Sequence, residues 1–111
     1  MINILIIKSK QNIITVEATG HSGYAEEGND IVCSAISTLM QNLANGLTEV
    51  VKANAKVIVD EDMPHLSVTL SEQDKEKCKY AQMLMQTTVL SLKEVANGYS
   101  KFIKIKEKQN D

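Results

Sequence analysis

The sequence predicts an α+β fold, a two-layer sandwich in which two helices cover one face of a sheet of about five strands. Short runs rich in β-branched residues predict the strands, and two longer stretches with apolar residues every three or four positions predict the helices. In chain order these elements read ββαββαβ. No linker, repeat or low-complexity segment divides the 111 residues, so we expect a single domain over residues 1–111.

Two hairpins supply four of the strands. The first joins residues 2–8 to residues 12–18 through a short polar turn. The second joins residues 56–60 to residues 65–70, and its turn holds the only proline, Pro64.

The alternating segment at residues 101–107 predicts the fifth strand, and the lysine-rich residues beyond it are expected to fray. The sheet face away from the helices must be solvated or covered by a partner. The apolar residues Ile4, Ile6 and Ile13 favour a homodimer on that face.

The first helix is predicted to begin after Asp30, a good N-cap residue. Its apolar stripe consists of Val32, Ile36, Leu39, Leu43, Leu47 and Val50. Gly46 interrupts this stretch and marks either a break or a close packing contact. For the second helix, Ser71 is the expected N-cap, with Asp74 three residues on, and Asn97-Gly98 is the expected end.

Composition narrows the class of protein. A net charge of −2 and the absence of arginine argue against nucleic-acid binding. The first residues lack the basic start and the cleavage site of a signal peptide, so we expect none. No apolar stretch is long enough to span a membrane, and we therefore expect a cytoplasmic protein. Two cysteines, Cys33 and Cys78, suggest no disulfide framework.

A glycine-rich segment separates the first hairpin from the first helix and carries the candidate chemistry. It begins with Gly20-His21, and Cys33 stands just inside the helix that follows. A helix N-terminus favours a thiolate over a thiol, and a histidine beside it would act as general base and acid. Backbone N–H groups at the same helix start are expected to hold a developing oxyanion. Asp30 either caps the helix or orients the imidazole of His21.

Other interpretations of the same residues stay open. Cys33 can be a small buried hydrophobe, and His21 a loop residue bonded to the backbone. Cys78 lies on the apolar side of its helix and is expected to be structural, and His65 to be an exposed turn residue. Two cysteines and two histidines without short spacings predict no metal site. The acidic residues Glu26, Glu27, Asp60, Glu61 and Asp62 either steer a cationic substrate or form a solvated surface.

The motif resembles the signature of the ribosomal-processing cysteine proteases called Prp. The matching residues are Gly20-His21-Ser22-Gly23-Tyr24-Ala25, Gly28, Asp30-Ile31-Val32-Cys33 and Ala35-Ile36-Ser37. The length and element order also resemble those of the family, so the resemblance covers nearly the whole chain. Ser34 departs from it mildly, because a smaller residue is usual there.

The resemblance implies a peptidase that removes the N-terminal extension of the large-subunit ribosomal protein numbered twenty-seven. It implies a catalytic dyad of Cys33 and His21, supported by Asp30, Ser37 and Gly20. The loop from Ser22 to Asn29 would then contact the substrate. It further implies a homodimer that needs no cofactor.

Two rival hypotheses belong to other classes. One is a non-catalytic, ribosome-associated binding module in which Cys33 is buried and distant from His21. The other is a thiol-dependent hydrolase that acts on another acyl substrate, such as a small amide or thioester.

Overall fold

The computed structural model describes residues 1–26, 30–60 and 65–110. Within these ranges the order of elements is β1 (Ile2–Ser9), β2 (Asn12–Thr19), α1 (Ile31–Asn45), η1 (Gly46–Val50), β3 (Ala55–Asp60), β4 (His65–Leu70), α2 (Lys75–Gly98) and β5 (Ile103–Gln109). The predicted order ββαββαβ and the α+β class are confirmed. None of the helices in the described ranges is long and apolar enough to cross a membrane.

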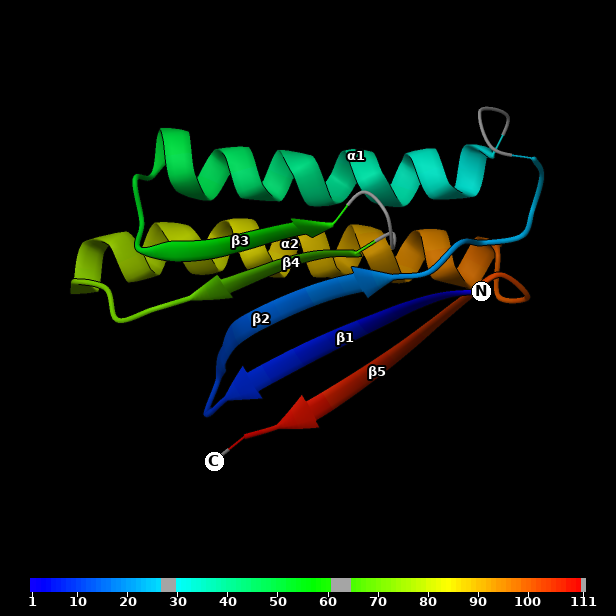
Figure 1. Cartoon of the computed structure of the whole chain (residues 1–111). Helices are drawn as coiled ribbons and strands as arrows, with labels where there is room; N and C mark the ends of the chain where they lie inside the picture. The colour runs from blue at the N-terminus through cyan, green and yellow to red at the C-terminus, as the bar shows by residue number, and fades with distance from the viewer. Residues whose placement is uncertain (27–29, 61–64, 111) are drawn as a thin grey trace.

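The five strands form one mixed sheet in the order β3-β4-β2-β1-β5. Three neighbouring pairs are antiparallel, whereas β1 and β5 are parallel. The two helices run side by side, with α2 behind the sheet (Figure 1). Helix α2 connects β4, which lies next to the edge strand β3, to β5 at the opposite edge of the sheet.

The core lies between the sheet and the helices. It contains the three isoleucines for which the sequence predicts a position on the open face. Ile4, Ile6 and Ile13 are 1%, 0% and 4% exposed, and they share one cluster with Met40 of α1 and Met85 of α2. The predicted position of these three residues on the open face is wrong, so they give no support to a homodimer there. Burial of this apolar area against the helices supplies the main driving force for folding.

The pairing of β1 with β2 is irregular near the hairpin, and a side chain from α2 completes it. The register shifts between Ile7 and Lys8, and Lys8 pairs with Ile13. The Gln82 amide donates to the Ile13 carbonyl at 2.8 Å and accepts from the Ile13 N–H at 2.9 Å. Gln82 thus acts as a strand partner for a buried backbone position.

The first helix continues past Gly46 as a wider π-helical turn that ends at Val50. A Cβ at Gly46 would lie 3.0 Å from Leu84 Cδ1 of α2. Of the two alternatives for this glycine, the close packing contact is therefore confirmed. Glycine allows the two helices to approach at this point.

The predicted start of α2 is wrong, because Asp74 caps the helix instead of Ser71. The Ser71 N–H donates to the Asn54 carbonyl at 2.9 Å, which holds residue 71 in the loop. The side chain of Gln73 also accepts from the Asn54 N–H at 2.7 Å. The predicted end at Asn97-Gly98 is confirmed.

The last strand has the predicted length but is shifted by two residues toward the C-terminus. Residues 99–102 form a turn in which the Phe102 N–H donates to the Tyr99 carbonyl at 2.9 Å, so β5 begins only at Ile103. It pairs with β1 as far as Gln109, opposite Lys8. The expected fraying of the lysine-rich residues is wrong as far as Gln109, because β1 is long enough to pair with them.

We predict that Gln82→Leu lowers the free energy of unfolding by about 2–4 kcal/mol, because it leaves both buried backbone groups of Ile13 without partners. Urea denaturation followed by circular dichroism measures the change. Gln86→Leu is the matched control, because Gln86 is exposed on the same helix. Equal losses in the two variants would contradict this role for Gln82.

Candidate active site

The start of α1 places Cys33 as the third residue of the helix. Asp30 is the N-cap, as predicted, and its Oδ1 accepts from the Val32 N–H at 3.0 Å and from the Cys33 N–H at 2.9 Å. Cys33 is half-buried, beside the fully buried Val32. The cap fixes where the helix begins, and this fixes the direction in which the Cys33 side chain leaves it.

The same cap uses the backbone donors that we expect to hold an oxyanion. Asp30 Oδ1 engages the N–H groups of Val32 and Cys33, and the Ser34 N–H donates to the Asp30 carbonyl at 3.1 Å. The expectation of free donors at these positions is therefore wrong. A carboxylate N-cap and an oxyanion hole compete for the same groups.

Asp30 is ionised in a buried setting. Burial raises the pKa of its carboxyl, but hydrogen bonds from the Ser22 hydroxyl, from the Cys33 backbone and side chain and from the Val32 N–H together lower that pKa below its ordinary value. Donors that prefer the charged form thus outweigh the cost of desolvation. A fixed negative charge lies next to the Cys33 thiol.

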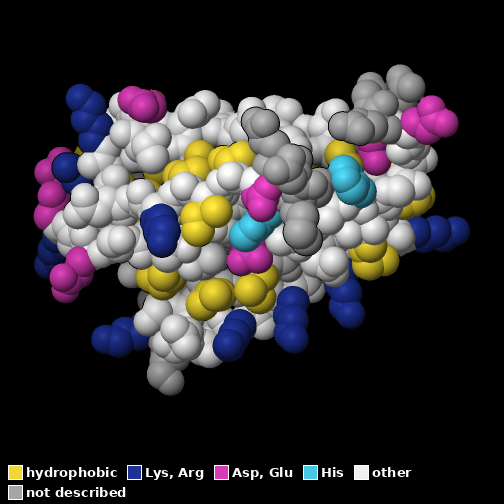
Figure 2. Space-filling model, viewed as in Figure 1, with side chains coloured by type: hydrophobic (Ala, Val, Ile, Leu, Met, Phe, Trp, Pro, Cys, Tyr) yellow, Lys and Arg dark blue, Asp and Glu magenta, His cyan; other side chains and the backbone are white. Residues whose placement is uncertain are grey.

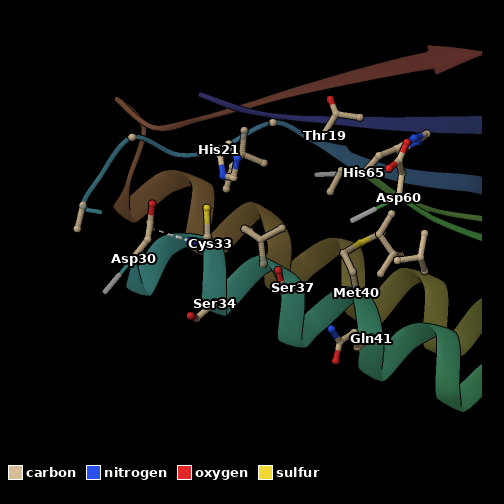
Figure 3. A pocket seen from close by; sticks show the side chains of 18 residues that line it. Thr19, His21, Asp30, Cys33, Ser34, Ser37, Met40, Gln41, Asp60 and His65 are labelled. Carbon is tan, nitrogen blue, oxygen red and sulfur yellow. Dashed lines mark hydrogen bonds between the residues drawn. The ribbon is translucent and has the colours of Figure 1, made fainter. Parts of the chain in front are cut away.

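His21 reaches the site through a turn that only glycine allows. Gly20 has φ +90°, and a Cβ there would lie 2.5 Å from the Met1 carbonyl oxygen. The turn ends β2 and carries the exposed His21 toward α1, where its ring is directed at Cys33 (Figure 3). Within the described residues, no hydrogen bond joins the His21 imidazole to the Cys33 thiol.

The residue that links these two parts is Ser22, to which the sequence gives no role beyond the loop. Ser22 is 4% exposed, and its N–H donates to Cys33 Sγ at 3.3 Å. Its hydroxyl donates to Asp30 Oδ2 and accepts from the Tyr24 N–H at 3.0 Å. No local pattern marks these contacts, because they require the fold to bring the loop onto α1.

The described part of the loop is also anchored at Tyr24. Its ring packs edge-on against Tyr99, with 5.8 Å between centroids, and against Phe102, with 5.3 Å. These contacts hold the loop against the end of α2 and the turn before β5. Residues 27–29 of the predicted substrate-contacting loop lie outside the described residues.

Cys33 and His21 open onto one cavity of about 580 Å³. Helix α1 supplies one wall through Ser34, Ser37 and Gln41 in addition to Cys33. Figure 3 shows Cys33 at one end and Met40, with Asp60 and His65 above it, at the other. Figure 2 shows hydrophobic side chains at the surface along the seam between α1 and β3. The cavity has the mixed polar and apolar lining that is typical of a ligand-binding site.

His65 belongs to the wall of this cavity, and its prediction as an exposed turn residue is wrong. It is the first residue of β4, paired with Thr19 of β2 and Asp60 of β3. Its side chain is 31% exposed, and Nε2 lies 3.4 Å from Glu17 Oε1. The position of His65 in the cavity wall depends on the pairing of β4 with β2, which are far apart in the sequence.

The remaining candidates lie elsewhere. Cys78 is half-buried on α2, does not line the cavity and accepts a hydrogen bond from Asn12 Nδ2 at 3.8 Å. Among the acidic residues, Asp60 lines the cavity and Glu26 is exposed, whereas Glu27, Glu61 and Asp62 lie outside the described residues. Over the described ranges, no group of three or more His, Cys, Asp or Glu residues is arranged to hold a metal ion.

Comparison with known proteins decides the family. Residues 1–104 match the family model described as cysteine protease Prp. This chain belongs to that family. Its relatives include the ribosomal processing cysteine protease Prp of Bacillus subtilis strain 168, 25% identical over 96 residues that cover 86% of each chain. The protein of the same name from Staphylococcus aureus strain Mu50 is 24% identical over 104 residues, 94% of this chain and 95% of that one.

Solved structures share the fold. The S. aureus Prp protease in complex with a covalently linked product peptide superposes with a TM-score of 0.87 at 23% identity, covering 97% of this chain and all of that one. SMU.848 from Streptococcus mutans gives a TM-score of 0.86 at 32% identity, covering 99% of this chain and 96% of that one. The predicted family and enzyme class, a cysteine protease, are confirmed.

We predict that Asp30→Asn lowers the free energy of unfolding by about 1 kcal/mol at pH 7, because it removes the charge that the cap and Ser22 stabilise. The pKa of Asp30 is lower in the folded than in the unfolded protein, so its contribution is complete above about pH 3.9. The contribution is then lost as the pH falls through the lowered folded pKa. The difference between wild type and Asp30→Asn should therefore shrink below pH 4.

Urea denaturation at pH 7, 5, 4 and 3 measures this difference. Asp74→Asn is the matched control, because Asp74 caps α2 in an exposed position, where it accepts from the Lys77 N–H at 2.8 Å. A difference between wild type and Asp30→Asn that stays constant from pH 7 to pH 3 would exclude the buried charge as its source.

Proposed function

We propose that this protein is a cysteine endopeptidase that removes the N-terminal extension of the large-subunit ribosomal protein numbered twenty-seven. Cys33 is the nucleophile, and His21 is the general base and acid. The observation that carries the proposal is that the thiol at the start of α1 and the imidazole after β2 face one another at one end of an elongated cavity. The B. subtilis and S. aureus relatives are named ribosomal processing cysteine proteases, which supports a substrate from the ribosome.

The reaction proceeds through an acyl-enzyme. His21 takes the proton from the Cys33 thiol, and the sulfur attacks the carbonyl carbon of the scissile bond. The imidazolium then protonates the leaving amine as the carbon–nitrogen bond breaks, and this leaves a thioester on Cys33. His21 next deprotonates a water molecule that attacks the thioester, and the thiol and the extension peptide are released.

Substrate binding completes the dyad in this proposal. His21 is exposed and shares no hydrogen bond with Cys33 in the described structure, and catalytic contacts often tighten only when substrate binds. A peptide in the cavity would exclude water from the imidazole and bring it onto the thiol. Ser37 lines the cavity one turn after Cys33 and offers a hydroxyl donor to the peptide carbonyl.

The acidic residues of the cavity suit this substrate. Asp30 and Asp60 line it, and a ribosomal protein is usually basic, so the peptide would be attracted to this surface. Two further parts of the proposal stay predictions: a homodimer in the cytoplasm, and activity without a cofactor.

We predict that Cys33→Ala abolishes cleavage and that His21→Ala lowers kcat/KM by about 10²- to 10⁴-fold. Mass spectrometry of the purified, extended ribosomal protein after incubation measures both rates. Cys78→Ser is the matched control and should cleave at the wild-type rate, because Cys78 lies away from the cavity. Wild-type rates in Cys33→Ala would rule out this function.

The same preparation separates the two rival hypotheses. A thiol hydrolase for other acyl groups would release thiol from small thioesters through Cys33 and leave the extended ribosomal protein intact. A binding module would do neither, and it would bind the extended protein equally well with Cys33→Ala.

A further inference from the structure

Ser22 has no task in the proposed reaction, yet it makes contacts on three sides of the site. It is 4% exposed in a segment whose neighbours His21 and Gly23 are exposed. We propose that Ser22 is a positioning residue that holds its own backbone N–H against the Cys33 sulfur and so keeps the nucleophile in its reactive state. This inference rests on the proposed role of Cys33.

The hydroxyl of Ser22 is fixed in orientation by two partners. It donates to Asp30 Oδ2 and accepts from the Tyr24 N–H at 3.0 Å. A serine hydroxyl has one proton to donate, so the bond to Asp30 commits it. Because the acceptor is a buried carboxylate, the contact is stronger than a bond between neutral groups.

The backbone of Ser22 is placed by this anchor. Its N–H donates to Cys33 Sγ at 3.3 Å, within the distance expected for a sulfur acceptor. A donor at the sulfur stabilises the thiolate more than the thiol, because it interacts with a full negative charge. It also offsets the repulsion from Asp30, whose charge lies next to the same sulfur.

The arrangement joins two parts of the chain. Asp30 Oδ1 holds the first turn of α1, while Oδ2 holds the loop that follows β2. The nucleophile and the donor that faces it are therefore positioned by the two oxygens of one carboxylate. A shift of Ser22 would move the donor away from Cys33 and would also move the adjacent His21.

The test compares variants at residue 22 in a Cys78→Ser background, with two readouts. One is the rate of Cys33 alkylation by iodoacetamide at pH 7, which needs no substrate. The other is kcat and KM for the extended ribosomal protein. Ser22→Ala keeps the backbone N–H and removes its anchor. Ser22→Thr keeps a hydroxyl. Ser71→Ala is the control, because it changes an exposed serine that does not line the cavity.

We predict that Ser22→Ala slows alkylation by about three- to tenfold, the worth of one hydrogen bond. It should lower kcat by about 10- to 100-fold, as expected when a reacting group is misplaced, with KM within about twofold. Ser22→Thr should restore both rates to within about threefold, since it keeps the hydroxyl. Asp30→Asn removes the acceptor for that hydroxyl and also the charge that repels the sulfur. Loss of that charge alone would speed alkylation, so the slower alkylation that we predict for Asp30→Asn reports the lost anchor. Combining Asp30→Asn with Ser22→Ala should add little.

A Ser22→Ala protein that is folded by circular dichroism and alkylates at the wild-type rate would overturn the proposal, even if its melting temperature falls. If Ser22→Ala does not fold, Asp30→Asn decides: an alkylation rate that is unchanged or faster overturns the proposal. Failure of the proposed function appears separately, as cleavage by Cys33→Ala. The alkylation rates of the Ser22 variants can still be compared in that case.

Discussion

The carboxylate of Asp30 is the interaction on which the rest of the site depends. It is buried and charged, and a buried charge persists only when donors surround it. Those donors come from two places, the first turn of α1 and Ser22 of the preceding loop. Because each oxygen is held from a different side, the loop and the helix cannot move independently without losing a hydrogen bond to a charge.

The sheet and α2 determine where that interaction forms. β2 ends at Thr19, and the backbone of the next residue, Gly20, lies so close to Met1 that no side chain fits. The loop then crosses to the end of α2, where Tyr24 packs on Tyr99 and Phe102. Cys33 thus lies where the ends of the sheet, both helices and the loop meet. Such a site is precise because it is supported from several directions, and it is accessible because it lies at an edge of the fold.

Much of this arrangement is visible in the sequence, and the rest depends on contacts between distant segments. Asp30 could be identified as a cap because capping is local: one polar residue precedes an apolar period of three to four. The class and the order of elements follow from similar periodicities. His65 could not be placed correctly, because its position depends on the pairing of β4 with β2. The face on which Ile4, Ile6 and Ile13 lie depends in the same way on where the helices pack.

Ser22 and Gly46 show the same limit at single residues. The sequence offers two alternatives for Gly46, and only the contact with Leu84 decides between them. In the sequence, nothing distinguishes Ser22 from other small polar residues of a glycine-rich loop. Its contacts with Asp30 and Cys33 form only when the loop folds onto α1. The conflict between a carboxylate cap and an oxyanion hole could be foreseen locally, since both need the same N–H groups.

The most direct test of the account uses a peptide that matches the proposed extension and ends in a chloromethyl ketone, which alkylates a nucleophile next to its binding site. Peptide mapping by mass spectrometry then gives separate rates for Cys33 and Cys78. We predict that the reagent modifies Cys33 much faster than Cys78, and that His21→Ala slows the Cys33 reaction by about 10²-fold or more. Equal rates at the two cysteines, or a Cys33 rate that is unchanged in His21→Ala, would contradict it.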